Sequence, residues 1–258
     1  MKKFCFTVDD NIRFLSDLTK LQFKSIFDHP YLGMYKRLHE RYELKVQLNL
    51  FFEDHRFDLT QMTDRYRNEW IENSHWLKLS FHSRREISNP YIASKYREVF
   101  EDCKNAHREI VRFASLATLG KTTTVHYCNL TDEGIEALKD NGVQGLLGLY
   151  GNDEHPHISY QNTFDECVAL RDGKIVLQNG ITYGGIDIVM NSFSKEGIEE
   201  QLNKLFHRNL IKVMIHEQYF YKDYRSYQED FEEKLNHTFN LLLQNGFSSI
   251  FFEEIILN

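Results

Sequence analysis

Short apolar runs alternate with longer amphipathic stretches along most of this chain. Stretches in which apolar residues recur three and four positions apart predict helices. The predicted helices are 11–18, 31–42, 59–70, 93–117, 131–142, 195–207 and 231–242. The short runs that predict strands are 4–8, 46–52, 76–81, 122–127, 145–150, 186–190, 211–215 and 249–252. Strands that alternate with helices indicate an α/β fold with a parallel sheet. This many units favours a distorted (β/α)7-8 barrel over an open doubly wound sheet.

The alternation is interrupted between Gly151 and Gly185. Two apolar runs, 167–170 and 175–177, flank Asp172-Gly173, and this pattern predicts an inserted β-hairpin. The insertion is too short for a core of its own, so we expect one domain over residues 1–258 with the hairpin as a rim or lid beside the strand ends. His155 and His157 also lie here, and such a polar loop pair is more often solvated than bound to metal.

Composition excludes several classes of protein. The chain has 258 residues, 41% of them hydrophobic, which is enough for a substantial core. A formal net charge of -7 argues against binding to nucleic acid, which needs basic patches. The 4 cysteines form no Cys-x-x-Cys pair. No apolar run approaches the length of a membrane span, so we expect a cytoplasmic protein without a membrane partner. Nothing in the sequence indicates an oligomeric state.

Two adjacent carboxylates, Asp9 and Asp10, end the first apolar run. Acids at the end of a buried strand are costly unless a positive group lies near them. One interpretation is that they cap the helix that begins near Ile12, as Asp often does. The other is that one acid binds a metal while its neighbour, which points to the opposite side of the strand, moves a proton.

The other strand ends carry similar chemistry. The residues at these ends, in chain order, are Asp9-Asp10, Glu53-Asp54-His55, His82, His126, Asp187 and His216-Glu217. In a barrel of this type the carboxyl ends of the strands surround the active site. Together these residues would form a pocket of oxygen and imidazole ligands, which suits Zn²⁺ or a similar divalent ion.

Three segments resemble motifs of the polysaccharide deacetylase superfamily, also called the NodB-homology or carbohydrate esterase family 4 group. Thr7-Val8-Asp9-Asp10 matches the family's Thr-Phe-Asp-Asp, and 82–86 (His-Ser-Arg-Arg-Glu) is similar to its His-Ser/Thr-x-x-His. Val213-Met214-Ile215-His216 is similar to its late Leu-x-Leu-His strand. The matches occur in the family's order and span most of the chain. The family's fold is a distorted (β/α) barrel.

The resemblance implies a role for each matched residue. Asp9 would be the general base and His216 the general acid. Asp10 and His82 would bind a divalent metal, Zn²⁺ first and Ni²⁺, Co²⁺ or Fe²⁺ as alternatives. Glu86 stands where the family has its second metal histidine, and a carboxylate can take that place.

Three further residues remain as candidates around this site. If Glu86 points away, His126 or Glu217 would complete the metal site, and otherwise we expect both to contact substrate. Asp187 falls near the family's aspartate that tunes the catalytic groups, and we place it with the substrate-binding residues as well.

The resemblance implies a hydrolase that removes N- or O-acetyl groups from a carbohydrate or small oligosaccharide. A second hypothesis, motivated by the missing metal histidine, is a barrel that has lost catalysis and binds a carbohydrate or a protein partner. A third is a glycosidase that uses a pair of carboxylates and no metal. Aromatic residues that either line a sugar site or belong to the core are Trp70, Trp76, Tyr91, Tyr150, Tyr219 and Phe220.

Overall fold

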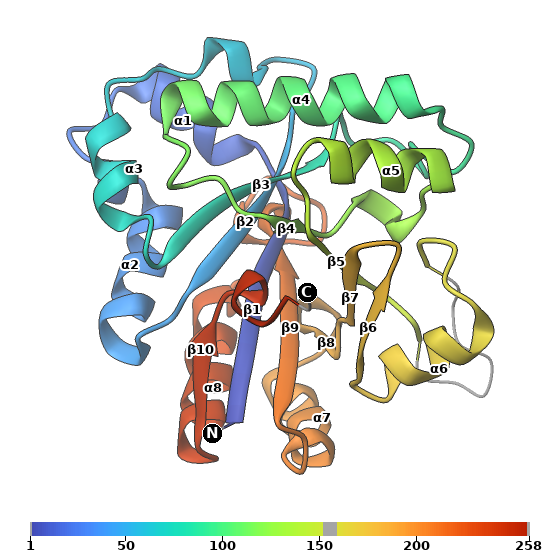
Figure 1. Cartoon of the computed structure of the whole chain (residues 1–258). Helices are drawn as coiled ribbons and strands as arrows, with labels where there is room; N and C mark the ends of the chain where they lie inside the picture. The colour runs from blue at the N-terminus through green and yellow to red at the C-terminus, as the bar shows by residue number, and fades with distance from the viewer. Residues whose placement is uncertain (1, 152–158, 257–258) are drawn as a thin grey trace.

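The structure is a computed structural model that describes residues 2–151 and 159–256 (Figure 1). The strands are β1 (Lys2–Asn11), β2 (Val46–Phe51), β3 (Leu77–Ser83), β4 (Thr122–Thr123), β5 (Gly145–Gly148), β6 (Ile175–Gln178), β7 (Ile181–Gly185), β8 (Ile188–Val189), β9 (Leu210–His216) and β10 (Phe247–Ile250). The α-helices are α1 (Arg13–Leu21), α2 (Pro30–Tyr42), α3 (Arg67–Asn73), α4 (Tyr96–Phe113), α5 (Asp132–Asp140), α6 (Phe164–Arg171), α7 (Lys195–Leu205) and α8 (Phe231–Gln244). Short 3-10 turns are η1 (Ile26–Asp28), η2 (Leu59–Gln61), η3 (His126–Cys128), η4 (Met190–Ser192), η5 (Glu217–Phe220) and η6 (Phe252–Ile255).

The strands form two sheets, and β1 is the centre of the larger one. Its order is β3-β2-β1-β9-β8, with all neighbours parallel. One edge of β1 is shared, because β10 pairs with its first half and β2 with its second half. The smaller sheet has the order β4-β5-β7-β6, in which only β6 is antiparallel to its neighbour.

The two sheets are joined at both ends. A parallel bridge between Leu79 and Leu119 connects β3 to the segment that enters β4. At the other end, β7 pairs with β5 while β8, which follows it directly, pairs with β9. The strands of the two sheets therefore follow one another around the barrel, from β1 through β2, β3, β4, β5 and β7 to β8 and β9. The predicted α/β fold, a distorted barrel of mostly parallel strands, is confirmed.

The helices pack on the outside of this barrel because each has one apolar face. In α4 the apolar residues that recur three and four positions apart are buried, and they are Val99, Cys103, Ala106, Ile110 and Phe113. α4 lies beside α5, and α8 lies against β10 and α7 (Figure 1). The core uses aromatic rings heavily, as in the contacts of Phe239 with Phe4 and Phe6. Trp70, Trp76, Tyr91 and Tyr150 are also buried, so these four belong to the core.

The structure differs from the predicted pattern around the fourth strand. Only Thr122–Thr123 pair as a strand, and the turn η3 follows in place of the predicted strand over 122–127. Side chains take the hydrogen bonds that a neighbouring strand would provide. The carbonyl of Thr124 contacts His82 Nδ1, and the amide of Val125 donates to the Tyr160 hydroxyl. Similarly, the predicted helix over 59–70 is the turn η2 followed by the separate helix α3.

A hairpin is present in the predicted insertion, but the prediction was wrong about its first strand and about its turn, because Asp172-Gly173 follows a helix and does not connect two strands. Residues 167–170 belong to helix α6, which starts with a reciprocal capping box between Thr163 and Glu166. The hairpin consists of β6 and β7 around Asn179-Gly180, both with positive φ (53° and 80°), as a two-residue turn requires. Because β7 also pairs with β5, the hairpin is part of the barrel wall. His155 and His157 lie outside the described residues.

Within residues 2–151 and 159–256, no helix combines the length and apolar character that crossing a membrane requires.

The close approach of β7 to α6 predicts the effect of adding one methyl group. A Cβ at Gly185 would lie 2.5 Å from the carbonyl oxygen of Leu170. We expect Gly185→Ala to lower the free energy of unfolding by roughly 1–3 kcal/mol, because this backbone contact cannot yield without moving the helix. Urea unfolding measures the change.

Gly197→Ala is the matched control. Its added Cβ meets nothing closer than 3.3 Å, and the residue lies in helix α7, where Ala is favoured over Gly by about 1 kcal/mol. We expect this variant to equal the parent or exceed it in stability. Equal losses in the two variants would show that the contact between β7 and α6 is not the cause.

Candidate metal centre

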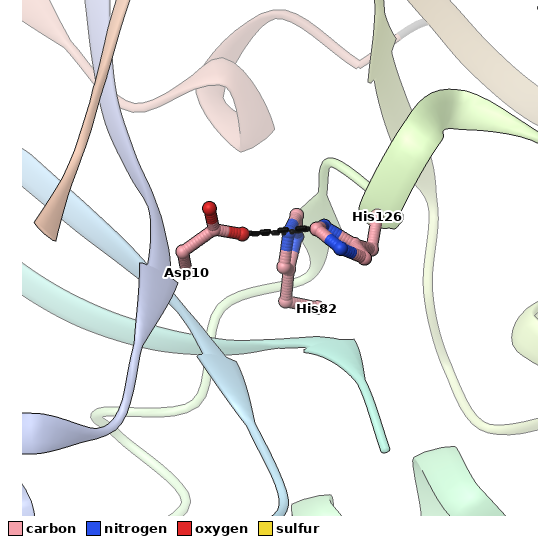
Figure 2. Close-up of side chains that lie close together, drawn as sticks. All are labelled: Asp10, His82 and His126. Carbon is pink, nitrogen blue, oxygen red and sulfur yellow. Dashed lines mark hydrogen bonds and ion pairs between the residues drawn. The ribbon is translucent and has the colours of Figure 1, made fainter. Parts of the chain in front are cut away.

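Three side chains from different strand ends meet at the carboxyl end of the barrel (Figure 2). Asp10 comes from β1, His82 from β3, and His126 from the turn after β4. Asp10 Oδ1 lies 3.0 Å from His82 Nε2 and 3.2 Å from His126 Nδ1. The two imidazole nitrogens are 3.1 Å apart. These are three potential ligand atoms in mutual contact, and Asp10 and His82 are buried.

The position of Asp10 depends on a bulge at the end of β1. The register between β1 and β2 shifts between Val8 and Asn11, and Asp10 has a φ of 61°, in the left-handed region that Asp tolerates better than most residues. Asn11 closes this bulge, since its amide nitrogen donates to the carbonyls of Val8 and Asn49. The bulge therefore releases Asp10 from the regular alternation of the strand.

The protonation of His82 follows from its second nitrogen. His82 Nδ1 contacts the carbonyl oxygen of Thr124, and a carbonyl can only accept, so Nδ1 carries the hydrogen. In the neutral imidazole the lone pair is then on Nε2, the atom that faces Asp10 and His126. A backbone contact of this kind fixes the ring orientation of many metal-binding histidines.

The electrostatics of the cluster favour an ionised carboxylate at Asp10. Burial acts to raise its pKa, but hydrogen bonds with His126 and His82 and the nearby His216 outweigh this and hold the pKa well below its ordinary value. Burial acts to lower the pKa of His82, yet Asp9 and Asp10 raise it overall. The pKa of Asp9 is raised, chiefly by burial. A buried carboxylate anion at Asp10 therefore lies beside two imidazoles, and its negative charge would compensate the positive charge of a bound cation.

The spacing of the three atoms fits a divalent ion. Ligands bound at about 2.0–2.2 Å in tetrahedral or octahedral geometry lie roughly 3.0–3.5 Å from one another. The observed separations of 3.0–3.2 Å fall in this range. Two imidazoles and one carboxylate form a donor set that Zn²⁺ and Fe²⁺ accept.

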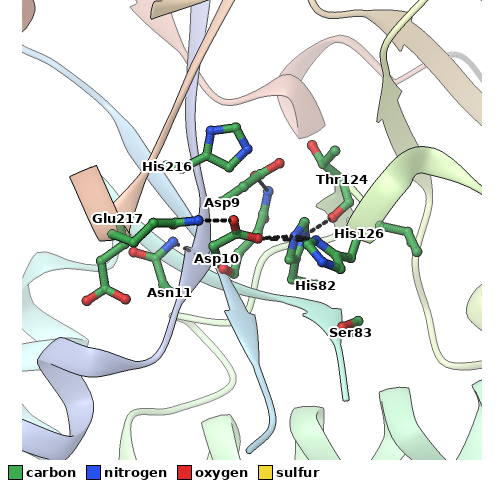
Figure 3. Close-up of polar contacts among 12 residues, drawn as sticks. Asp9, Asp10, Asn11, His82, Ser83, Thr124, His126, His216 and Glu217 are labelled. Carbon is green, nitrogen blue, oxygen red and sulfur yellow. Dashed lines mark hydrogen bonds and ion pairs between the residues drawn. The ribbon is translucent and has the colours of Figure 1, made fainter. Parts of the chain in front are cut away.

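Asp9 and His216 flank the cluster (Figure 3). They are register partners in the pairing of β1 with β9. Asp9 is 2% exposed, and its Oδ1 accepts a 2.7 Å hydrogen bond from the amide of Asn49. His216 Nδ1 lies 2.8 Å from the amide oxygen of Asn191, so this nitrogen carries a hydrogen and Nε2 is available for proton transfer.

The cluster formed by the described residues does not include Glu86. That side chain is exposed in the loop after β3, and His126 from the turn after β4 is the third member instead. Glu86 follows His82 by four residues, a spacing that would place both side chains on one side of a helix. The chain is not helical there, so Glu86 does not return to the strand end.

Asp187 and Glu217 are engaged by the fold itself. Asp187 precedes β8, and its carboxylate forms ion pairs with Arg208 (2.6 Å) and the buried Lys212 (3.0 Å). Glu217 is fully buried and accepts hydrogen bonds from the backbone amides of residues 12, 13 and 14 at the start of α1. Neither carboxylate belongs to the cluster, and Glu217 performs the capping that the sequence had suggested for the Asp pair.

The sequence analysis did not identify the amide side chains that hold this site. Gln218 donates to Asp10, Asn49 to Asp9, and Asn191 accepts from His216. Their only signal in the sequence is proximity to strand ends, and neutral amides are common at such positions.

A scan against protein-family models and a search of curated proteins gave no match. Solved structures do match. A peptidoglycan N-acetylglucosamine deacetylase gives a TM-score of 0.53 at 10% identity, with 98% of this chain and 87% of the other covered. A carbohydrate esterase family 4 pseudoenzyme from Bacillus anthracis gives 0.53 at 10%, with 99% of this chain and 66% of the other covered. The chain has the fold of the polysaccharide deacetylases.

The same deacetylase fold occurs in a protein of different activity. The 4-alpha-glucanotransferase from Thermococcus litoralis gives a TM-score of 0.57 at 13% identity, with 98% of this chain and 40% of the other covered. Identities this low establish the architecture only. The choice of chemistry within the deacetylase fold therefore depends on the residues of the site.

The buried position of Glu217 predicts a structural loss on truncation. Glu217→Ala removes the acceptor for three backbone amides at the start of α1, and we expect it to lower the free energy of unfolding by roughly 3 kcal/mol or more. Glu217→Gln keeps one acceptor oxygen and should lose less. Urea unfolding of the metal-free proteins measures both. Equal stability of the alanine variant and the parent would contradict the assignment.

Proposed function

We propose that this protein is a metal-dependent hydrolase that removes N- or O-acetyl groups from a carbohydrate. The observation that carries the proposal is the cluster of Asp10, His82 and His126 at the strand ends of a deacetylase fold. A second carboxylate, Asp9, and a third imidazole, His216, lie beside it. This is the set of groups that hydrolysis of an acetyl group requires.

Asp10, His82 and His126 would hold the ion, with Zn²⁺ as the first candidate and Ni²⁺, Co²⁺ or Fe²⁺ as alternatives. When bound, such an ion polarises the acetyl carbonyl and lowers the pKa of a coordinated water towards about 7. His126 thereby takes the place that the sequence analysis gave to Glu86. With two neutral imidazoles and one carboxylate as its ligands, a divalent ion would give the site a net positive charge, which would stabilise a developing oxyanion.

Asp9 is assigned the role of general base. Its raised pKa brings it closer to the range in which a carboxylate accepts a proton readily. The hydrogen bond from Asn49 fixes one carboxylate oxygen, so the group is oriented before substrate binds.

His216 is assigned the role of general acid. Asn191 holds Nδ1, which presents Nε2 to the site. A proton on Nε2 would pass to the nitrogen or oxygen that leaves the acetyl group.

Two alternatives are tested by the same measurements. A binding protein without catalysis was motivated by the missing metal histidine, and His126 removes that motivation because it offers a second imidazole. A metal-free glycosidase needs two carboxylates that act directly on sugar, whereas Asp10 is engaged by His82 and His126.

Metal content is the first test. Protein purified without a histidine tag and reconstituted with Zn²⁺ should retain about one ion per chain after gel filtration, as measured by plasma mass spectrometry. Asp10→Ala and His126→Ala should each abolish stoichiometric binding, since each removes one of three ligands. Glu86→Ala is the control and should bind like the parent. Loss of metal in the Glu86 variant, or none in the parent, would contradict this ligand set.

Separation of metal binding from hydrolysis is the second test. Asp9→Asn should retain the metal but lower the rate of acetate release from N-acetylglucosamine oligomers by roughly 10²–10⁴, the usual contribution of a general base. Activity of the parent should disappear with a chelator and return with Zn²⁺. A metal-loaded parent that releases no acetate from N- or O-acetylated oligosaccharides would favour the binding protein, and activity without metal would favour the glycosidase.

A further inference from the structure

Gln218 connects the end of β9 to the candidate metal centre. It lies two residues after His216, in the turn η5, and its side chain reaches across to β1. Its amide nitrogen Nε2 donates a hydrogen bond of 2.6 Å to Asp10 Oδ2. This is the carboxylate oxygen that the two imidazoles do not contact, because both lie against Oδ1.

The orientation of this amide is determined by chemistry. An ionised carboxylate can only accept, so the amide nitrogen must face Asp10 and the carbonyl oxygen Oε1 must face away from it. Oε1 is nevertheless buried, and it has no hydrogen-bond partner within the part of the chain that the structure describes. Leaving a buried acceptor unpaired is unfavourable, so the placement has to be compensated by something else.

We propose that Gln218 is the positioning residue for the ligand Asp10. This inference rests on the metal site of the proposed function. By holding Oδ2, Gln218 leaves Oδ1 alone to face the ion together with His82 Nε2 and His126 Nδ1, so that Asp10 binds through one oxygen.

Two features of the cluster support this role. Asp10 sits at a bulge with a backbone conformation outside the regular strand, so its carboxylate needs a second restraint to keep one orientation. His82 is restrained in the corresponding way, since its other nitrogen contacts the carbonyl of Thr124. Two of the three ligands are therefore each fixed through the atom that does not face the cluster, which is the usual arrangement in protein metal sites.

Zn²⁺ alone is sufficient as the probe. Gln218→Leu removes the donor while keeping similar bulk, and we expect its Zn²⁺ affinity, measured by competition with a chelating dye, to fall roughly 10–100-fold. The visible absorption spectrum of the Co²⁺-loaded variant should also change, because Asp10 becomes free to bind through both oxygens. A residue that only supported the fold would not alter this spectrum.

Gln178→Leu is the matched control. Gln178 is also half-buried and its side chain also takes part in a hydrogen bond, which its Oε1 accepts from the amide of Asn162, but it lies on β6 outside the cluster. We expect parental Zn²⁺ affinity and an unchanged Co²⁺ spectrum. Circular dichroism checks that each variant is folded. If Gln218→Leu is not folded, Gln218→Met is used in its place, because methionine keeps the unbranched shape of glutamine.

The outcomes separate this inference from the function on which it rests. Weaker Zn²⁺ binding with a changed Co²⁺ spectrum, seen in the Gln218 variant and not in the Gln178 variant, supports the positioning role even if no acetate is ever released. Parental affinity with an unchanged spectrum in the Gln218 variant overturns it. A parent that binds no divalent ion overturns both this inference and the metal-dependent function.

Discussion

The negative charge of Asp10 is the constraint around which the end of this barrel is arranged. A carboxylate that is 9% exposed must be compensated, and the structure supplies two imidazoles on one oxygen and an amide on the other. These partners come from β3, from the turn after β4 and from the turn after β9, so the charge is balanced only when distant parts of the chain are brought together. The same convergence that compensates the charge of Asp10 also places three potential metal-ligand atoms next to one another.

The barrel interior below the cluster continues this polar arrangement. Asn49 donates to Asp9 and accepts from Gln47, and Gln47 in turn exchanges hydrogen bonds with Thr122 of the opposite sheet. Most small barrels fill this space with apolar side chains. A buried network that is fully paired fixes the orientation of each member, and here its last member is the proposed general base.

The same fold can host different chemistry, and this chain brings a different imidazole to the end of its barrel than the resemblance implies. The deacetylase, the pseudoenzyme and the glucanotransferase share the architecture, so the fold leaves the reaction open. The resemblance places the second metal histidine four residues after the first, on the same loop. Here the imidazole of His126, from the turn after β4, lies next to His82, while the residue at the expected position, Glu86, is exposed to solvent. A metal site requires a donor atom at a given position, and residues from more than one adjacent strand end can place a donor atom there.

The sequence by itself determined the alternation of strands and helices, the ends of most helices, and the presence of acids and imidazoles at strand ends. These are local properties, set by apolar periodicity and by capping residues such as Thr131. It also identified Asp10 and His82, because each directly ends an apolar run. Only the tertiary structure decided which further residues join them. His126, Gln218 and Glu86 are separated from Asp10 along the chain, and their distances depend on strand order, on the bulge in β1 and on where β4 stops. The hairpin shows the same division: two apolar runs near turn residues indicated it, but its turn is Asn179-Gly180 and not the predicted Asp172-Gly173, because residues 167–170 are helical and pack against β7.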